Sequence, residues 1–396
     1  MPEHALEDRP SSTALLVALA VVIGLLSWAW WLFEPTPTGR ALNFSLLAGA
    51  VFGVLLQRSR FCFFCITRDY VERRDPSGLL GLLAALAVGS LGYHAVFSSF
   101  VPDPFNGRLP PDAHIGPVSA VLVLGAGLFG VGMAISGSCI SAHLYRLGEG
   151  AFASVFALLG VLLGFVLGFL SWNQLYLNLI ADAPTLWLPG QLGYAGSLLV
   201  QLAALAALAW LLLRFARPQL PAAEPLSIGQ RIWRRRWPTY VGGLLVGALG
   251  VVCYVRVAPL GVTAELGSVA RTGAGSLGWL PDRLHGLDGF SGCATVVKQV
   301  LLSNNGAFIG ALVLGAWASA LVAGDWQPKL PGVAQSLRSL LGGVLMGWGA
   351  MLALGCTVGT LLSGIMAGAL SGWVFALFCL AGLLAGLWLR RVLGWH

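Results

Sequence analysis

Four of the seven cysteines in this chain of 396 residues stand where their sulfur atoms could do chemistry. Cys62 and Cys65 form a CxxC pair within QRSRFCFFC. Cys139 and Cys356 each follow a glycine-containing turn, in GSCISAHLYRLGEG and LGCTVGTLLSGIMAG. Because seven is an odd number and most of the cysteines lie in or beside apolar runs, a disulfide scaffold is not expected. The thiols are therefore candidates for binding or redox chemistry.

The sequences that precede Cys139 and Cys356 repeat one another. When the two cysteines are aligned, three glycines before each coincide, and both segments read G-x4-G-x-G-x6-C. These glycines are Gly125, Gly130 and Gly132 in the first copy and Gly342, Gly347 and Gly349 in the second. Each copy lies at the end of an apolar run of about 20 residues, the length that crosses a bilayer. Most of these glycines are expected to let helix backbones approach closely in lipid.

Close helix packing does not explain why each row of glycines ends in a cysteine followed by more small residues. At these points the chain can break its helix, so the predicted turn residues are Gly137, Ser138, Gly355 and Thr357. A helix break at membrane depth is tolerated only where it is buried in protein or lines a cavity. Free backbone N–H groups at the start of a helix carry partial positive charge and favour an anion.

The sulfur of a thiol is soft and polarizable, and the thiol is a weak donor that solvates a hard oxyanion such as sulfate poorly. It can instead contact a terminal sulfur, as in thiosulfate, or a selenium atom. We therefore favour a binding role for Cys139, Cys356 and Cys62. Cys253 and Cys379 lie in plain apolar runs without a motif, and we interpret them as small buried hydrophobic residues.

The CxxC pair of Cys62 and Cys65 leaves an alternative open, because such pairs carry out thiol–disulfide exchange or bind metals. A metal site would need a second pair or nearby histidines, and none of the six His residues is spaced to help, so no metal site is predicted. A redox relay would need paired cysteines elsewhere, whereas Cys139, Cys293 and Cys356 stand alone. For Cys293, in GFSGCATVV, a binding role and simple burial both remain open.

The elements that must position these cysteines are apolar helices. Hydrophobic residues make up 57% of the chain and charged residues 10%, which excludes an ordinary soluble domain and intrinsic disorder. We expect an all-α polytopic membrane protein with broken or re-entrant glycine-rich segments. The predicted spans, with boundaries uncertain by a few residues, are 13–33, 42–57, 78–101, 118–137, 151–171, 195–215, 239–257, 305–324, 337–355 and 371–389.

The positions of Lys and Arg predict the orientation in the membrane. With the N-terminus inside, most of the 23 basic residues fall in segments on that side, so both termini are predicted to be cytoplasmic. Residues 214–238 then form a cytoplasmic linker that contains an RRR run beside Trp233 and Trp237. We interpret this run as a lipid-headgroup anchor and expect no nucleic-acid partner.

The spans and the repeated motif divide the chain into four parts. Residues 1–41 hold an extra N-terminal span, 42–171 the first repeat, 172–238 a connecting span with the linker, and 239–396 the second repeat. An odd number of crossings separates the copies, so the second repeat is inverted, an arrangement typical of transporters. The segment 258–304, which contains Cys293, is too long and glycine-rich for a plain loop.

The sequence contains few residues that could couple transport to a source of energy. Ionisable residues are nearly absent from the predicted spans, with His94 the main exception, so a proton relay is not indicated. The chain contains no G-x4-G-K-[ST] phosphate loop and is not expected to hydrolyse ATP. We expect a permease with passive or weakly coupled passage and not an enzyme, and we predict no cofactor.

Three segments resemble the YeeE/YedE family of bacterial inner-membrane sulfur transporters: QRSRFCFF, GLFGVGMAISGSCISAHLYRLGEG and LLGGVLMGWGAMLALGCTVGTLLSGIMAGALSGW. The resemblance covers roughly 42–171 and 239–390. It implies a multi-pass protein of the bacterial inner membrane, built of inverted repeats, that imports thiosulfate or, in some members, a selenium species. It also implies that a line of thiols passes the ion along, and these match Cys62, Cys139 and Cys356. The partner that it suggests is a small cytoplasmic sulfur-carrier or sulfurtransferase protein.

The leading hypothesis is therefore a bilayer-embedded permease that imports thiosulfate past Cys62, Cys139 and Cys356, with Cys65 and Cys293 as further candidates. One alternative keeps this site but changes the substrate to a selenium compound. The other is a membrane thiol–disulfide protein that works through Cys62 and Cys65.

Overall fold

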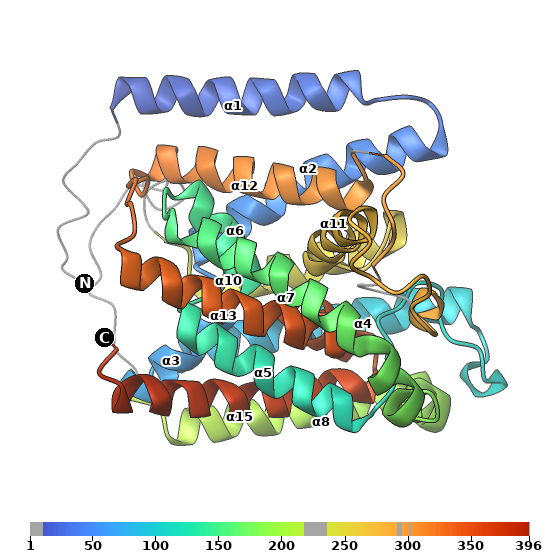
Figure 1. Cartoon of the computed structure of the whole chain (residues 1–396). Coiled ribbons are helices and arrows are strands. Elements are labelled where there is room, and N and C mark those ends of the chain that lie inside the picture. The colour runs from blue at the N-terminus through green and yellow to red at the C-terminus, as the bar shows by residue number, and fades with distance from the viewer. Residues whose placement is uncertain (1–10, 218–235, 291–294, 301, 396) are drawn as a thin grey trace.

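The computed structural model describes residues 11–217, 236–290, 295–300 and 302–395, and helices dominate it (Figure 1). Within these ranges the chain forms no strand, and extended pairing is limited to isolated bridges between single residues. The predicted all-α class is thus confirmed. Arg234 and Arg235 of the RRR run, Trp233 and Cys293 lie outside the described residues, whereas Arg236 lies 3.7 Å from Asp325.

In the described part of the chain, nine helical segments are long and apolar enough to cross a bilayer. They are α1 (Ser12–Trp31), α2 (Pro37–Ser59) continued by α3 (Phe63–Arg73), α4 (Ser77–Phe100), α5 (Ala120–Ser136) continued by α6 (Ile140–Gly148), α7 (Ala153–Leu175), α8 (Pro189–Arg214), α10 (Thr239–Arg256), α12 (Asn304–Ala323) and α15 (Leu370–Val392). A tenth candidate is a bent pair, a broken span or a re-entrant segment, in which α13 (Val333–Leu352) is followed at a bend of 43° by η5 (Thr357–Ser363) and α14 (Gly364–Met366). Each predicted span corresponds to one of these helices, as expected for a multi-pass membrane protein.

The second span is longer than its predicted range of 42–57. Thr36 caps the helix by accepting a hydrogen bond from the Gly39 N–H at 3.1 Å, and the helix continues to Ser59. Arg58, which follows the predicted span 42–57, therefore lies inside α2 and is 2% exposed. Hydropathy missed this turn because its polar side chains are satisfied by partners distant in the sequence.

Two ends of the helix bundle can be distinguished in Figure 1. Helix α1 begins and α15 ends at one of them, which we call the terminal face and which is on the left of the figure. The connection from α1 to α2 and the segment 101–119 lie at the other end, the opposite face. Helices α2, α5, α12 and α15 run toward the terminal face, and α4, α7, α10 and α13 run away from it.

Glycines allow these helices to pack closely. Helix α5 lies antiparallel to α13, with Gly125 against Gly349 and Gly132 against Gly342. Helix α13 also packs along α7, where a Cβ on Gly347 would overlap the Val161 carbonyl. The other main helix pairs are α2 with α12, α4 with α10, and α5 with α15. Backbone contact of this kind is how helices associate where lipid gives no hydrophobic drive.

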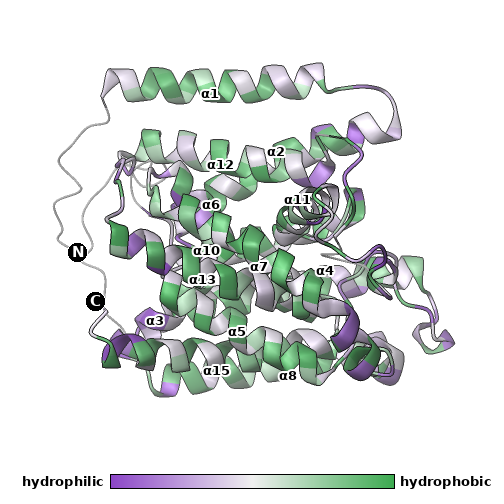
Figure 2. Cartoon of the chain, viewed as in Figure 1, coloured by the Kyte–Doolittle hydropathy of each residue, from purple (hydrophilic) through white to green (hydrophobic). Residues whose placement is uncertain are grey.

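Most helices consist mainly of apolar residues (Figure 2), and many large apolar side chains are exposed on the outside of the bundle. Leu16 on α1 is 65% exposed and Leu199 on α8 is 69% exposed, and both helices bury only a small share of their residues. Surfaces of this kind are stable against acyl chains and unstable in water, so they indicate contact with a bilayer.

The long segment 258–304 contains a helix, as its length suggested. Helix α11 (Thr263–Ser276) packs against α7 near the opposite face and carries Glu265, which pairs with Lys298. Its first residue, Thr263, is buried beside the turn that carries Cys356. The segment thus contributes to the environment of the second motif cysteine.

Candidate functional site

The first cysteine motif forms a sharp break between α5 and α6. Gly137 ends α5 in the left-handed region, with φ +83°, and its N–H donates to the Met133 carbonyl. Residues with a Cβ rarely adopt this conformation, which explains why glycine stands there. Ser138 is fully buried, and Cys139 begins α6 as its N-cap residue with 0% exposure. The predicted turn therefore exists and holds the Cys139 thiol inside the bundle.

The Cys139 thiol is one of three that converge there. Cys62 lies between α2 and α3 as the N-cap residue of α3, and its thiol is within hydrogen-bonding reach of both Cys65 and Cys139. The Cys139 sulfur also lies 3.3 Å from the Ser141 hydroxyl oxygen. All three cysteines are free thiols. We call Cys62, Cys65 and Cys139 the thiol cluster, which joins residues from the two predicted motifs of the first half.

An arginine lies against the thiol cluster. The guanidinium of Arg146 donates to the Cys65 sulfur at 3.1 Å and to the Gly137 carbonyl at 3.3 Å. It thus bridges the CxxC segment and the turn before Cys139. A cation beside polarizable sulfur atoms at membrane depth gives an anion both a charge and soft contacts.

The sequence pattern does not single out Arg146, because it follows the predicted span 118–137 and resembles any basic residue of a connecting segment. The available signal is its spacing: Arg146 follows Cys139, the N-cap residue of α6, by seven residues, or about two helical turns. His143, one turn after Cys139, was also missed; its Nδ1 lies 3.2 Å from the Ser154 hydroxyl.

Polar side chains close the terminal face next to the thiol cluster. The Gln57 amide donates to Asp325 at 3.0 Å and to Glu149 at 3.3 Å, and its carbonyl oxygen accepts from Ser319 at 2.7 Å. Asp325 also faces Arg58 at 4.0 Å. The ends of α2, α6 and α12 are therefore tied together immediately before the CxxC segment.

The second motif forms a different turn. Leu354 adopts φ +54°, Gly355 adopts φ +156°, and Cys356 precedes the π-helical segment η5, whose first residue is Thr357. The Cys356 sulfur accepts from the Val358 N–H at 3.4 Å and lies beside the Thr263 hydroxyl. Strained left-handed backbone at a non-glycine residue such as Leu354 is often found at functional sites.

The two motif cysteines lie at different depths. Gly342 of α13 packs against Ser136, three residues before Cys139, whereas Cys356 lies beyond the end of α13 at Leu352. The part of α13 between Gly342 and Leu352 is about 15 Å long. The thiol cluster is thus nearer the terminal face and Cys356 nearer the opposite face.

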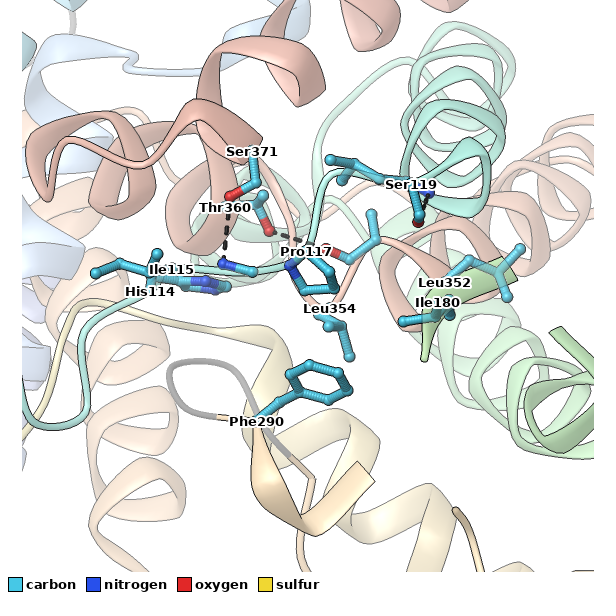
Figure 3. Close-up of a pocket in the computed structure, with 13 residues that line it drawn as sticks. His114, Ile115, Pro117, Ser119, Ile180, Phe290, Leu352, Leu354, Thr360 and Ser371 are labelled. Carbon is cyan, nitrogen blue, oxygen red and sulfur yellow. Dashed lines mark hydrogen bonds between the residues drawn. The ribbon is translucent and has the colours of Figure 1, made fainter. Parts of the chain in front are cut away.

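A narrow pocket lies against Leu354 and Thr360, on either side of Cys356 in the sequence, and is also lined by the segment 114–117 (Figure 3). It is lined by His114, Ser119, Phe290, Leu354 and Thr360, among others, and its volume of about 10 Å³ holds roughly one water molecule. A second cavity of similar size lies on the other side of Leu354, between Thr263 and Thr295. An ion of several atoms would have to widen these spaces in order to pass.

The remaining cysteines divide as follows. Cys253 in α10 and Cys379 in α15 are buried within plain helices, as expected for small hydrophobic residues. Cys293 lies outside the described residues. Among the described residues, no group of three or more Cys, His, Asp or Glu side chains is arranged to hold a metal ion.

The arrangement has counterparts among known proteins. A family model described as sulphur transport matches residues 58–385, a range that includes both motif cysteines and the CxxC pair. The chain belongs to the sulphur transport family. The expected membership of the YeeE/YedE group of sulfur transporters is thereby confirmed.

Curated relatives agree with this family. The chain is 28% identical over 357 residues to the thiosulfate transporter TsuA of Spirochaeta thermophila, an alignment that covers 85% of this chain and 95% of that protein. It is 26% identical over 367 residues to TsuA of Escherichia coli, covering 88% and 94%. A probable transporter of Escherichia coli, YedE, is 26% identical over 184 residues, covering 46% and 43%.

The family supports a function in the transport of sulfur compounds. The relatives are named as transporters, in agreement with the expectation that the chain is not an enzyme. The family match begins at residue 58, so α1 and most of α2 lie before it.

Proposed function

We propose that this protein imports thiosulfate, or a closely related sulfur oxyanion, along a path that passes Cys356 and then the thiol cluster. The observation that carries the proposal is the convergence of three free thiols with Arg146 inside the helix bundle. The terminal sulfur of thiosulfate is soft and suits thiol contacts, while the guanidinium attracts the negative charge. The names of the two TsuA relatives support this substrate.

The proposed direction follows from charge. If both termini are in the cytoplasm of a bacterial inner membrane, as the distribution of Lys and Arg predicts, the opposite face is outside. The ion then meets the pocket beside His114 first, Cys356 second and the thiol cluster last. Because about 15 Å of helix separates Cys356 from the thiol cluster, the ion binds at these two sites in succession and does not contact both at once.

We also propose that residues 42–171 and 239–396 are inverted repeats. In this relation each helix of the first repeat has a counterpart in the second: α2 corresponds to α10, α4 to α12, α5 to α13 and α7 to α15. Exchanging counterparts turns the packed pair α2–α12 into α10–α4 and the packed pair α7–α13 into α15–α5, and both resulting pairs are also packed. The contact of Gly125 with Gly349 becomes that of Gly342 with Gly132. Each transformed contact is one that the fold contains, which supports a twofold relation within the membrane.

A partner at the terminal face is part of the proposal. The thiol cluster lies toward this face, so sulfur that has passed it is available to a small cytoplasmic sulfur-carrier or sulfurtransferase protein. Consumption at the exit would draw further ions through a passive path.

Growth on thiosulfate as the sole sulfur source tests the transport function, in a bacterial strain that lacks its own uptake system. Cells with the wild-type protein are expected to grow, and Cys62→Ala, Cys139→Ala and Cys356→Ala are expected to reduce growth strongly. Cys253→Ala is the control, because Cys253 is also buried, at 5% exposure, but lies in a plain helix. If Cys139→Ala and Cys356→Ala both grow like wild type at equal expression, the cysteine path is wrong.

The contact of Cys62 with Cys65 specifically favours one other candidate function, thiol–disulfide exchange. This function requires both thiols to cycle between reduced and oxidised states, so it predicts that Cys65→Ser abolishes activity and that a mixed disulfide can be trapped. The transport proposal predicts that the thiols stay reduced during uptake.

A selenium compound as the substrate is the third possibility. Competition of radiolabelled thiosulfate uptake by selenium compounds separates it from thiosulfate transport.

A further inference from the structure

His114 has a buried ring nitrogen without a partner. The residue lies in the segment between α4 and α5, its side chain is 3% exposed, and its Nε2 atom makes no hydrogen bond within the described part of the chain. A buried polar atom without a partner costs free energy, so it requires an explanation in a folded protein. Burial also lowers the pKa of His114 to about 4, so the ring is neutral at neutral pH.

The unpartnered nitrogen lies next to the Cys356 turn. Nε2 is 2.8 Å from the position that a Cβ would occupy on Gly355, the residue immediately before Cys356. A larger residue at 355 would therefore collide with the imidazole. Figure 3 shows the ring on the wall of the pocket that leads to this turn, near Pro117 and Leu354.

Hydroxyl groups surround the same turn. Thr263 and Thr295 line the cavity on the other side of Leu354, and the Oγ1 atom of Thr295 is also buried without a hydrogen-bond partner in the described residues. Thr263 lies beside the Cys356 thiol, as Cys62 lies beside Cys139 in the other half. The site near the opposite face thus has a hydroxyl where the site near the terminal face has a second thiol.

This difference matches the two ends of a thiosulfate-like ion. Neutral N–H and O–H donors suit the hard oxygens of a sulfonate group, whereas a thiol suits a terminal sulfur. We propose that His114 donates a hydrogen bond to an oxygen of the substrate while the terminal sulfur of the substrate faces Cys356. His114 therefore selects for ions that carry both oxyanion oxygens and a terminal sulfur. This inference rests on the proposed function and adds the residue that recognises the oxygen atoms.

Uptake kinetics in proteoliposomes, with radiolabelled thiosulfate, test the inference. His114→Leu keeps much of the side-chain volume but cannot donate, and it is expected to raise KM at least about tenfold, as for a lost hydrogen bond to a charged ligand. Vmax is expected to change much less, and His114→Gln is expected to restore part of the affinity. His285→Leu is the control, because His285 lies in the segment after α11 but does not line the pocket.

The outcomes separate the inference from the proposed function. Failure of the wild-type protein to take up thiosulfate overturns the proposed function and the inference with it. If wild type transports but His114→Leu keeps its KM, or if His114→Leu and His114→Gln lower Vmax equally at unchanged KM, the recognition role is wrong and the transport function stands. A purely structural role for His114 predicts the last of these results.

Discussion

Arg146 joins a positive charge to the sulfur atoms of the thiol cluster. Its guanidinium contacts the Cys65 sulfur and the Gly137 carbonyl, so it holds the CxxC segment to the turn that presents Cys139. A cation placed at membrane depth is expensive and usually has a function. In the proposed path, Arg146 compensates the negative charge of the ion while the thiols contact the terminal sulfur of the ion.

Replacement of Arg146 tests this role. Arg146→Gln is expected to lower the apparent affinity for thiosulfate by about tenfold or more, because a charge-assisted contact is lost. Arg146→Lys, which keeps the charge but not the planar fork, is expected to be intermediate. Concentration-dependent uptake measures the effect, with Arg73→Gln on the exposed surface of α3 as the control. Equal affinity in the Gln variant and wild type would contradict a role in anion binding.

The candidate residues differed in how well the sequence could predict them. Cys139 and Cys356 were recognisable because a duplicated glycine row precedes each. The meeting of Cys62 with Cys139 could not be read from the sequence, since it depends on how α3 and α6 fold back toward one another. His114 gave no signal at all, because a single histidine in a connecting segment has no periodicity that would mark it as buried.

At the level of helices, α5 contains one glycine whose missing Cβ allows close packing and another with open space at that position. Gly130 packs so closely on α15 that a Cβ would overlap the Cys379 carbonyl, whereas no atom lies within 4 Å of the corresponding position on Gly127. The two residues are three apart on one helix and have the same intrinsic propensity. They therefore provide a matched pair for measuring what close packing contributes.

We expect Gly130→Ala to destabilise the protein by about 1–3 kcal/mol, as overpacking does. Gly127→Ala is expected to be neutral or slightly stabilising, because alanine favours a helix by roughly 1 kcal/mol over glycine. Thermal unfolding of the purified protein in detergent gives both values as shifts in Tm. Equal shifts for the two variants would mean that the α5–α15 contact does not limit stability.

Hydropathy predicted the helices well because each span must present a long apolar stretch to lipid. It failed where polar groups are satisfied inside the protein, as at Arg58 near the end of α2. It also could not predict that the two motif turns differ. Gly137 ends an α-helix in the usual left-handed conformation, whereas Leu354 and Gly355 lead into π-helical backbone.

On the scale of the whole molecule, the proposed twofold relation makes the protein symmetric in fold but asymmetric in chemistry. Cys139 has Cys62 beside it and Arg146 bound to the preceding turn, whereas Cys356 has Thr263 and a pocket with His114. A chain that duplicated its scaffold and diversified the two sites would offer different contacts at entry and at exit. The direction of transport then depends on which face is outside.

Labelling of intact cells determines this orientation. A membrane-impermeant maleimide is expected to label Asn106→Cys, an exposed position on the opposite face, and not Arg73→Cys on the terminal face. A C-terminal green fluorescent protein fusion is expected to fluoresce, because that reporter folds in the cytoplasm. The wild-type protein, whose described cysteines are buried or partly buried, sets the background. The reverse labelling pattern would invert the proposed direction.

The narrowness of the pocket beside His114 has a consequence for cellular energetics. If the proposed path stays as narrow as this pocket, which has room for about one water molecule, it preserves the ion gradients on which the cell depends. A dianion entering against an inside-negative potential of 100 mV is opposed by about 4.6 kcal/mol, since each charge contributes about 2.3 kcal/mol. This opposition alone would hold the internal concentration more than about a thousandfold below the external one. If the proposed import is passive, net uptake therefore proceeds only as fast as metabolism removes sulfur on the cytoplasmic side, and sulfur demand regulates entry.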